Sequence, residues 1–118
     1  MNYEEKAPIP RDRAIVELES EDAERVARAL VRVAFHERDR AWVEDLLATH
    51  LQSDDPWVRG VAATCAGHVA RVHRMLNTTR LVPLIEALAS DQSTIGRMED
   101  ALEDIEMFVG TGRRSADD

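Results

Sequence analysis

The stretch SDDPWVRGVAATCAGHVARV, residues 53–72, decides the fold that the sequence predicts. It opens with a turn, residues 53–55, followed by Pro56, whose missing N–H costs nothing at the first position of a helix. The helix that begins here should continue to about His73. One side of it is apolar, and a second side consists of very small residues: Gly60, Ala63 and Gly67. Because each glycine costs about 1 kcal/mol relative to alanine inside a helix, we expect another helix to pack closely on this side.

The pattern repeats about 37 residues later along the chain. In each copy an apolar helix leads through a Ser-Asp turn into a second helix. The first copy carries Leu47, Leu51, Ser53, Asp54, Val58 and Cys65 where the second carries Leu84, Leu88, Ser90, Asp91, Ile95 and Leu102. Such a period is typical of stacked helix-hairpin repeats, in which each unit buries its apolar faces against its neighbours. The clearest repeats are predicted at residues 41–73 and 78–109.

Two further helices are predicted before the first repeat. Pro10 suits the first turn of a short helix over residues 11–19, and Ser20 can cap a longer helix that ends near His36. Their apolar positions are Ala14, Ile15 and Leu18 in the first helix and Val26, Leu30, Val33 and Ala34 in the second. Residues at this spacing lie on one side of a helix. These two helices therefore predict a third, more degenerate hairpin.

The sequence also predicts where the helices of the two repeats begin and end and which of their sides are apolar. Asp39 can cap the third helix, Asn77 lies in the break before the fifth, and Pro83 is tolerable in the first turn of that fifth helix. The third helix has Trp42, Val43, Leu46, Leu47 and Leu51 on its apolar face and Glu44, Asp45 and Gln52 mostly on the other. The fourth has Val58, Ala62, Cys65, Val69 and Val72 on its apolar side, and the sixth has Ile95, Met98, Leu102, Ile105 and Val109. Gly110 and Gly112 should end the sixth helix.

We therefore predict an all-α fold, a short right-handed α-solenoid of about three helical hairpins. Residues 1–112 should form a single domain, and the polar tail, residues 113–118, should be disordered. The chain has 118 residues, which is too few for a second independent unit.

Composition narrows the classes of partner. Fifteen Lys and Arg residues against 23 Asp and Glu residues give a net charge of −8. This balance disfavours nucleic acid and anionic membrane as ligands and suits a basic protein, although it also serves to keep a small protein dispersed. With one cysteine and no long apolar run, the chain is expected to be cytoplasmic.

No catalytic or metal site is predicted. The four histidines, His36, His50, His68 and His73, do not fall at a recognisable zinc spacing. Cys65 lies in the middle of an apolar stripe, where burial raises the pKa of a thiol and shields it. No phosphate-binding loop, nucleophile elbow or Ser/His/Asp arrangement is present, so no cofactor is expected.

The candidate partner-binding residues are an acidic cluster on the sixth helix together with one tryptophan. They are Glu99, Asp100, Glu103, Asp104, Glu106 and Trp57. Like charges at i, i+4 spacing repel by a few tenths of a kcal/mol, so a basic partner would compensate them, although a solvated helix face is the simpler alternative. The tryptophan follows a turn and is a candidate interface anchor, unless it packs on the neighbouring turn.

The turn and helix of residues 53–72 resemble the HEAT-repeat signature: an acidic turn, a proline, Val-Arg and then a helix of small residues. The resemblance covers about residues 41–109 and implies a HEAT-like or ARM-like superhelix. It also implies a structural ladder in which Arg59 bonds Asp54 or Asp55. The second copy departs from the pattern, because Gly96 stands where Arg59 stood. Small bacterial proteins of this kind resemble stand-alone HEAT-like domains, some of which act as immunity proteins of toxin systems.

The sequence thus favours a non-enzymatic protein-binding module, most concretely an immunity-type inhibitor whose acidic surface covers a basic toxin. The alternative is a structural or adaptor repeat protein that self-associates or regulates an enzyme complex. We expect a monomer or a weak homo-oligomer.

Overall fold

The computed structural model describes residues 7–110, and this part of the chain is helical, as predicted. The helices are α1 Arg11–Leu18, α2 Ala23–His36, α3 Arg40–His50, α4 Pro56–His73, α5 Thr78–Glu86 and α6 Gln92–Phe108. A 3-10 helix, η2 Ala87–Ser90, connects α5 to α6. Gly112 and the predicted disordered tail lie outside the described residues. In the described part of the chain, every helix is too short or too polar to span a lipid bilayer.

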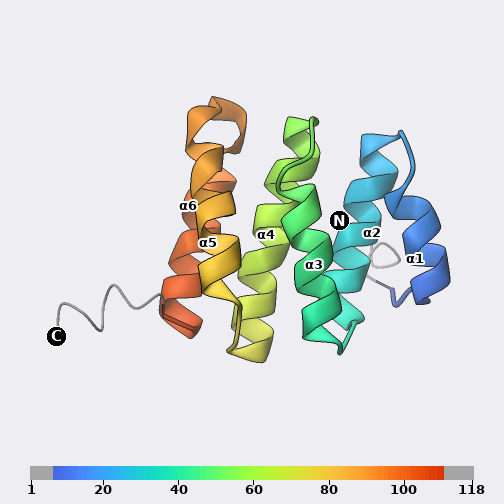
Figure 1. Ribbon diagram of the computed structural model, residues 1–118, viewed down its shortest axis with the longest axis horizontal. Coiled ribbons are helices and arrows are strands. Elements are labelled where there is room, and N and C mark those ends of the chain that lie inside the picture. The colour runs from blue at the N-terminus through green and yellow to red at the C-terminus, as the bar shows by residue number, and fades with distance from the viewer. Residues whose placement is uncertain (1–6, 111–118) are drawn as a thin grey trace, which may run out of the picture.

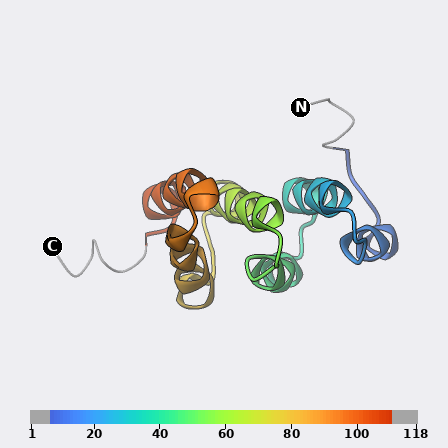
Figure 2. The same ribbon diagram turned by 90° about the horizontal axis from the view of Figure 1, so that it is seen from above.

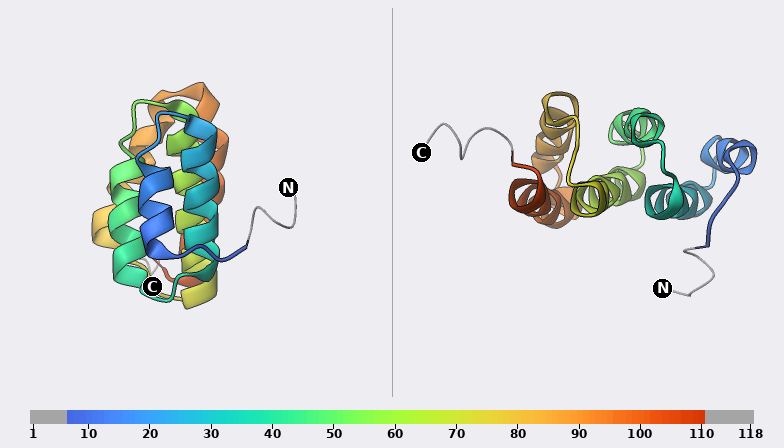
Figure 3. Two further views of the ribbon diagram at one scale, coloured as in Figure 1. Left: turned by 90° about the vertical axis from the view of Figure 1, so that its right-hand side faces the viewer. Right: turned by 90° about the horizontal axis from the view of Figure 1, so that it is seen from below.

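The helices form three antiparallel pairs placed side by side along the long axis of the molecule (Figure 1). The second helices of the pairs, α2, α4 and α6, form one layer, and α1, α3 and α5 form the other (Figure 2). Figure 3 shows the same two layers from the α1 end in its left panel and, in its right panel, from below, the side opposite to that of Figure 2. Since each pair is antiparallel, α2, α4 and α6 run parallel to one another, and α4 packs against both of its layer neighbours.

Acidic or amide side chains cap five of the helices. Asp55 Oδ1 accepts hydrogen bonds from the backbone N–H groups of Trp57 (2.8 Å) and Val58 (3.2 Å), as the Asp-Pro start predicted. The other caps are Asp22, Asp39, Asn77 and Asp91. The cap of α2 differs from the prediction, because Asp22 accepts from Glu24 N–H while Ser20 Oγ accepts from Asp22 N–H instead.

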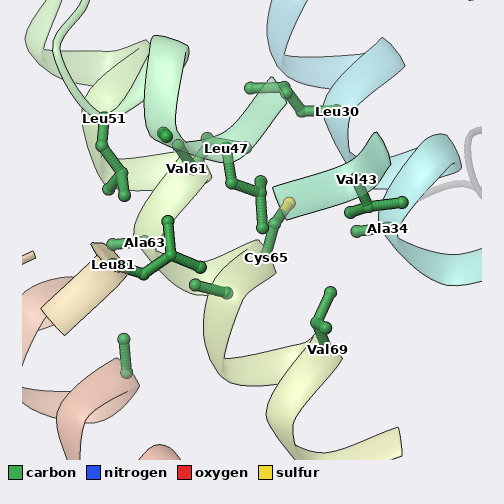
Figure 4. Packing of buried hydrophobic residues seen from close by; sticks show 14 of the residues in the cluster. Leu30, Ala34, Val43, Leu47, Leu51, Val61, Ala63, Cys65, Val69 and Leu81 are labelled. Atoms are coloured by element: carbon green, nitrogen blue, oxygen red, sulfur yellow. The ribbon is translucent and has the colours of Figure 1, made fainter. Parts of the chain in front are cut away.

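The core lies between the layers, where side chains from all three pairs meet (Figure 4). Leu30, Leu47, Leu81, Ile85 and Ile105 are its largest fully buried aliphatic residues. On α4 the predicted stripe of small residues is buried against α6: a Cβ added at Gly67 would lie 3.3 Å from the Cα of Ala101. The two helices therefore approach as closely as the two glycines predicted.

The register of the second repeat differs by one residue from the predicted offset of 37. The capping residues Asp55 and Asp91 are 36 residues apart. The buried positions follow the same offset, and Val58, Ala62, Cys65 and Val69 of α4 correspond to Thr94, Met98, Ala101 and Ile105 of α6. A shift of one residue rotates a helix face by about 100°. Ile95, predicted to be buried, is consequently exposed, and Leu102 is half-buried.

Some side chains have environments other than those predicted. Ile15 and Val72 are 45% and 56% exposed. Trp42 is half-buried, and the guanidinium carbon of Arg11 lies 4.5 Å from its ring centre. Glu44, placed on the outer face by the sequence pattern, is buried and accepts hydrogen bonds from Asn77 N–H (2.7 Å) and from Arg40 Nη1 (2.8 Å). It thereby ties α3 to the break before α5.

Arg59 connects two successive pairs rather than bonding Asp54 or Asp55. Its Nη1 donates to Ser53 O at 2.7 Å, and its Nη2 donates to Asp91 Oδ2 at 3.1 Å. The acidic partner therefore comes from the turn of the next pair, at the position equivalent to Asp55. Asp54 is exposed.

Candidate partner-binding groove

The layer of α2, α4 and α6 encloses a groove of about 880 Å³ on its outer face. Its apolar lining includes Val31 and Phe35 of α2 and Trp57 and Val61 of α4. Its charged lining consists of Glu24, Arg28, Arg71, Arg97, Asp100 and Asp104. A groove with exposed aromatic side chains beside charged ones has the composition of a protein-binding surface.

A tryptophan and an arginine form one end of this groove. Trp57 is 51% exposed, and the guanidinium carbon of Arg97 lies 5.0 Å from its ring centre. Arg97 Nη1 also donates a hydrogen bond to Thr64 Oγ1 at 2.7 Å. The predicted anchor Trp57 therefore both contacts the next pair and presents much of its surface to solvent.

Gly60 makes room for this arrangement. A Cβ at Gly60 would lie 2.9 Å from Cδ of Arg97, closer than carbon atoms approach one another. The side chain of Arg97 can lie flat against α4 only because this position carries no side chain. Two contacts and one glycine thus fix the conformation of Arg97.

An aromatic stack forms the other part of the groove. The rings of Phe35 on α2 and His68 on α4 are stacked, with centroids 3.9 Å apart and planes 6° from parallel. Arg71 Nη2 lies 3.4 Å from Nδ1 of His68. The stack connects α2 with α4, so His68 contributes to the packing of these two helices.

No protein-family model and no curated protein matches the chain. Among solved structures, a chain of the crystal structure of the CDI complex from Cupriavidus taiwanensis matches with a TM-score of 0.77 and 31% sequence identity. The match covers 92% of this chain and 97% of that one. The chain belongs to the family of that CDI complex protein. The two proteins therefore share one fold over nearly their whole lengths.

In this CDI family member, the predicted partner-binding residues divide between two surfaces. Asp100, Asp104 and Trp57 line the groove. Glu99 and Glu103 are exposed on α6 but do not line it, and Glu106 is half-buried. The helical period explains the division, since positions 97, 100 and 104 lie on the groove side of α6. The sequence pattern had treated the acidic residues as one face.

The charges of the groove are only partly neutralised. Glu24 and Arg28 form an ion pair at 2.6 Å along α2. Within residues 7–110, by contrast, neither Arg71 nor Arg97 has a carboxylate within 4.0 Å, and neither Asp100 nor Asp104 has a cationic partner. The groove therefore carries both cationic and anionic groups without ion-pair partners among the described residues.

Cys65 underlies the groove but is not a nucleophile. Its side chain is buried, and burial raises the pKa of the thiol to about 12. Among the described residues, no group of three or more His, Cys, Asp or Glu side chains is arranged to hold a metal ion.

Phe35, Arg71 and Arg97 belong to the groove but were not singled out from the sequence. Aligning the two capping aspartates, Asp55 and Asp91, would have placed Arg97 on the groove side.

Proposed function

We propose that this chain is the immunity-type member of a contact-dependent inhibition pair and that it binds and inhibits a toxin protein. The observation that carries this proposal is the similarity, 31% identical over nearly both full lengths, to a chain of a CDI complex. A protein of such a complex binds another protein, and this chain has a groove suited to that task. The binding takes place in the cytoplasm, where an inhibitor protects its own cell.

The chemistry of the groove supports an inhibitor rather than the toxic enzyme. A catalytic thiol or imidazole needs access to substrate. The only thiol, Cys65, is buried with a pKa of about 12, and His68 is stacked on Phe35. Binding through an exposed tryptophan beside an arginine needs neither group, since these residue types dominate the energetics of protein interfaces.

The acidic surface of α6 supports a basic partner. Glu99, Asp100 and Glu103 are exposed on this helix, and the chain as a whole has a net charge of −8. Opposite charges on the two partners accelerate encounter and make the association rate fall as salt rises. The proposed binding residues also include Asp104 and Trp57, which line the groove beside this surface, and the half-buried Glu106.

We further propose that the three pairs form a HEAT-like right-handed solenoid. The side-by-side arrangement of the pairs and the Arg59–Asp91 hydrogen bond between successive turns support this description. In such a scaffold the second helices of the pairs provide the binding face, and here those helices line the groove.

The proposal is tested with the protein encoded by the gene adjacent to this one, because an inhibitor and its toxin must be made together. Co-expression should relieve the growth arrest that the adjacent protein causes alone, and the two proteins should co-purify. Neutralising Glu99, Asp100, Glu103 and Asp104 with Gln or Asn should slow association and flatten its salt dependence while helicity is unchanged. An unchanged association rate would refute this surface, and absence of both protection and binding would refute the function.

The alternative, self-association, is favoured by one observation. Ile15 and Val16 are 45% and 63% exposed on α1, the helix at the open end of the stack. Burying them against a second copy would remove apolar surface from water. Sedimentation analysis over a wide concentration range decides: a dimer that Val16→Asp dissociates would support this alternative, and a monomer throughout would exclude it.

A further inference from the structure

The groove offers its charges in a definite order. Gly60 of α4 lies against Arg97 and Thr94, and Gly67 lies against Ala101 and Asp104, so α4 and α6 run in parallel register. Arg97 therefore lies near the N-terminal end of the groove, Asp100 and Asp104 follow along α6, and Arg71 of α4 lies beyond them. With a rise of 1.5 Å per residue, about 10 Å of helix separate Arg97 from Asp104.

Arg97 is held ready to bind an anionic group. Its conformation is fixed by the hydrogen bond to Thr64, the contact with Trp57 and the close approach to Gly60. Of the five N–H donors of a guanidinium, Thr64 occupies one. A side chain already held in place loses little conformational entropy on binding, and a guanidinium matches a carboxylate in geometry as well as in charge.

We infer that the partner places a carboxylate side chain on Arg97 and a basic side chain on Asp104, about 10 Å further along the groove, with an apolar group covering Trp57. This inference rests on the proposed function, because it assumes a protein partner. It adds a feature that a uniformly acidic surface lacks: one arginine selects, among basic proteins, those with an acidic residue at the matching position. Arg97 then determines specificity, since a partner with a lysine there would meet like charge.

The test uses charge reversal at two arginines and measures the Kd for the protein encoded by the adjacent gene at fixed salt. Arg13 is exposed on α1, in the other layer, so Arg13→Glu changes the net charge as much as Arg97→Glu does. If the affinity of the partner depends only on the net negative charge of this protein, both substitutions should tighten binding slightly. We expect Arg97→Glu to weaken binding by about 100-fold and Arg13→Glu to leave it unchanged or slightly tighter.

A second variant distinguishes the loss of the charge from a loss of structure. Arg97→Met keeps the aliphatic stem that lies over Gly60 but removes the charge, and it should weaken binding by about 10-fold with a circular dichroism spectrum like that of the natural protein. Equal Kd values for the Arg97→Glu and Arg13→Glu proteins would overturn the inference and leave the proposed function standing. If the unaltered protein does not bind the adjacent gene product, the proposed function fails and the inference fails with it.

Discussion

The guanidinium of Arg59 donates to the carboxylate of Asp91 at 3.1 Å, across 32 residues of sequence. The same guanidinium donates to Ser53 O, so a single side chain connects the turn before α4 with the turn before α6. The capping carboxylate of one helix thereby also binds the arginine of the preceding pair, which fixes the spacing between the pairs.

Replacing Arg59 with alanine should lower the free energy of unfolding by about 1–3 kcal/mol, because both hydrogen bonds of this partly buried guanidinium are lost. Urea denaturation followed by circular dichroism measures the change. The control is Arg80→Ala, whose ion pair with Asp45 is more exposed, with side-chain exposures of 47% and 66%. That control should cost about 0.5 kcal/mol or less. Equal losses in the two variants would contradict a linking role for Arg59.

Asp91 should contribute to a loss of stability in acid. The N–H and hydroxyl of Ser93, with a further contribution from Arg59, hold the pKa of Asp91 below its ordinary value of 3.8. Since the folded pKa is lower than the unfolded one, the stabilisation is fully present above about pH 4 and is lost as the pH falls through the folded pKa. Asp91→Asn keeps a capping oxygen and should flatten the fall of the urea midpoint below about pH 4. Asp54→Asn, at an exposed position, should keep the original slope; a steeper slope for Asp91→Asn would contradict the assignment.

Gly67 and Gly96 should respond to alanine with opposite signs. A Cβ at Gly67 would lie 3.1 Å from Oδ2 of Asp104 and 3.3 Å from the Cα of Ala101, which is backbone and cannot rotate away. Overpacking of this kind costs about 1–3 kcal/mol and exceeds the gain in helix propensity, so Gly67→Ala should destabilise. Among the described residues, apart from the chain neighbours of Gly96 and the nearby backbone of its own helix, no heavy atom lies within 4 Å of a Cβ at Gly96, so Gly96→Ala should stabilise by about 0.5–1 kcal/mol. Thermal unfolding measures both; stabilisation by both alanines would show that α4 and α6 are further apart.

Glu44→Ala should destabilise by about 2 kcal/mol, because it leaves the N–H of Asn77 and the guanidinium of Arg40 without their acceptor. Glu44→Gln retains a carbonyl oxygen for Asn77 and should cost less. Chemical denaturation of the two variants checks the order. A larger loss for glutamine than for alanine would mean that the carboxylate does not hold the break before α5.

The sequence predicted those features that depend on local chemistry. The Asp55-Pro56 start of α4, the close packing at Gly67 and the burial of Cys65 follow from capping, helix propensity and periodicity, each of which acts within a few residues. The all-α class follows from the same patterns summed along the chain.

Features that depend on the register between the repeats, or on contacts between residues far apart in the sequence, could not be predicted from these local patterns. The second helices of the two repeats correspond at an offset of 36 residues rather than 37, and this difference of one residue rotates the expected face of α6, so Ile95 was placed inside and Arg97 was overlooked. Glu44 is buried because a backbone N–H 33 residues away supplies its hydrogen bond, and no helical pattern records that contact. The stack of Phe35 on His68 likewise joins two helices that only the fold brings together.

The alternation along α6 separates the side chains that hold the core from those that face outward. Thr94, Met98, Ala101 and Ile105 anchor the helix in the core, whereas Asp100 and Asp104 face outward with no cationic partner among residues 7–110. Mutations at these outward positions can accumulate while the scaffold keeps its fold. A lineage could therefore exchange one set of surface side chains for another, and so acquire a new binding preference, without first passing through unstable intermediates.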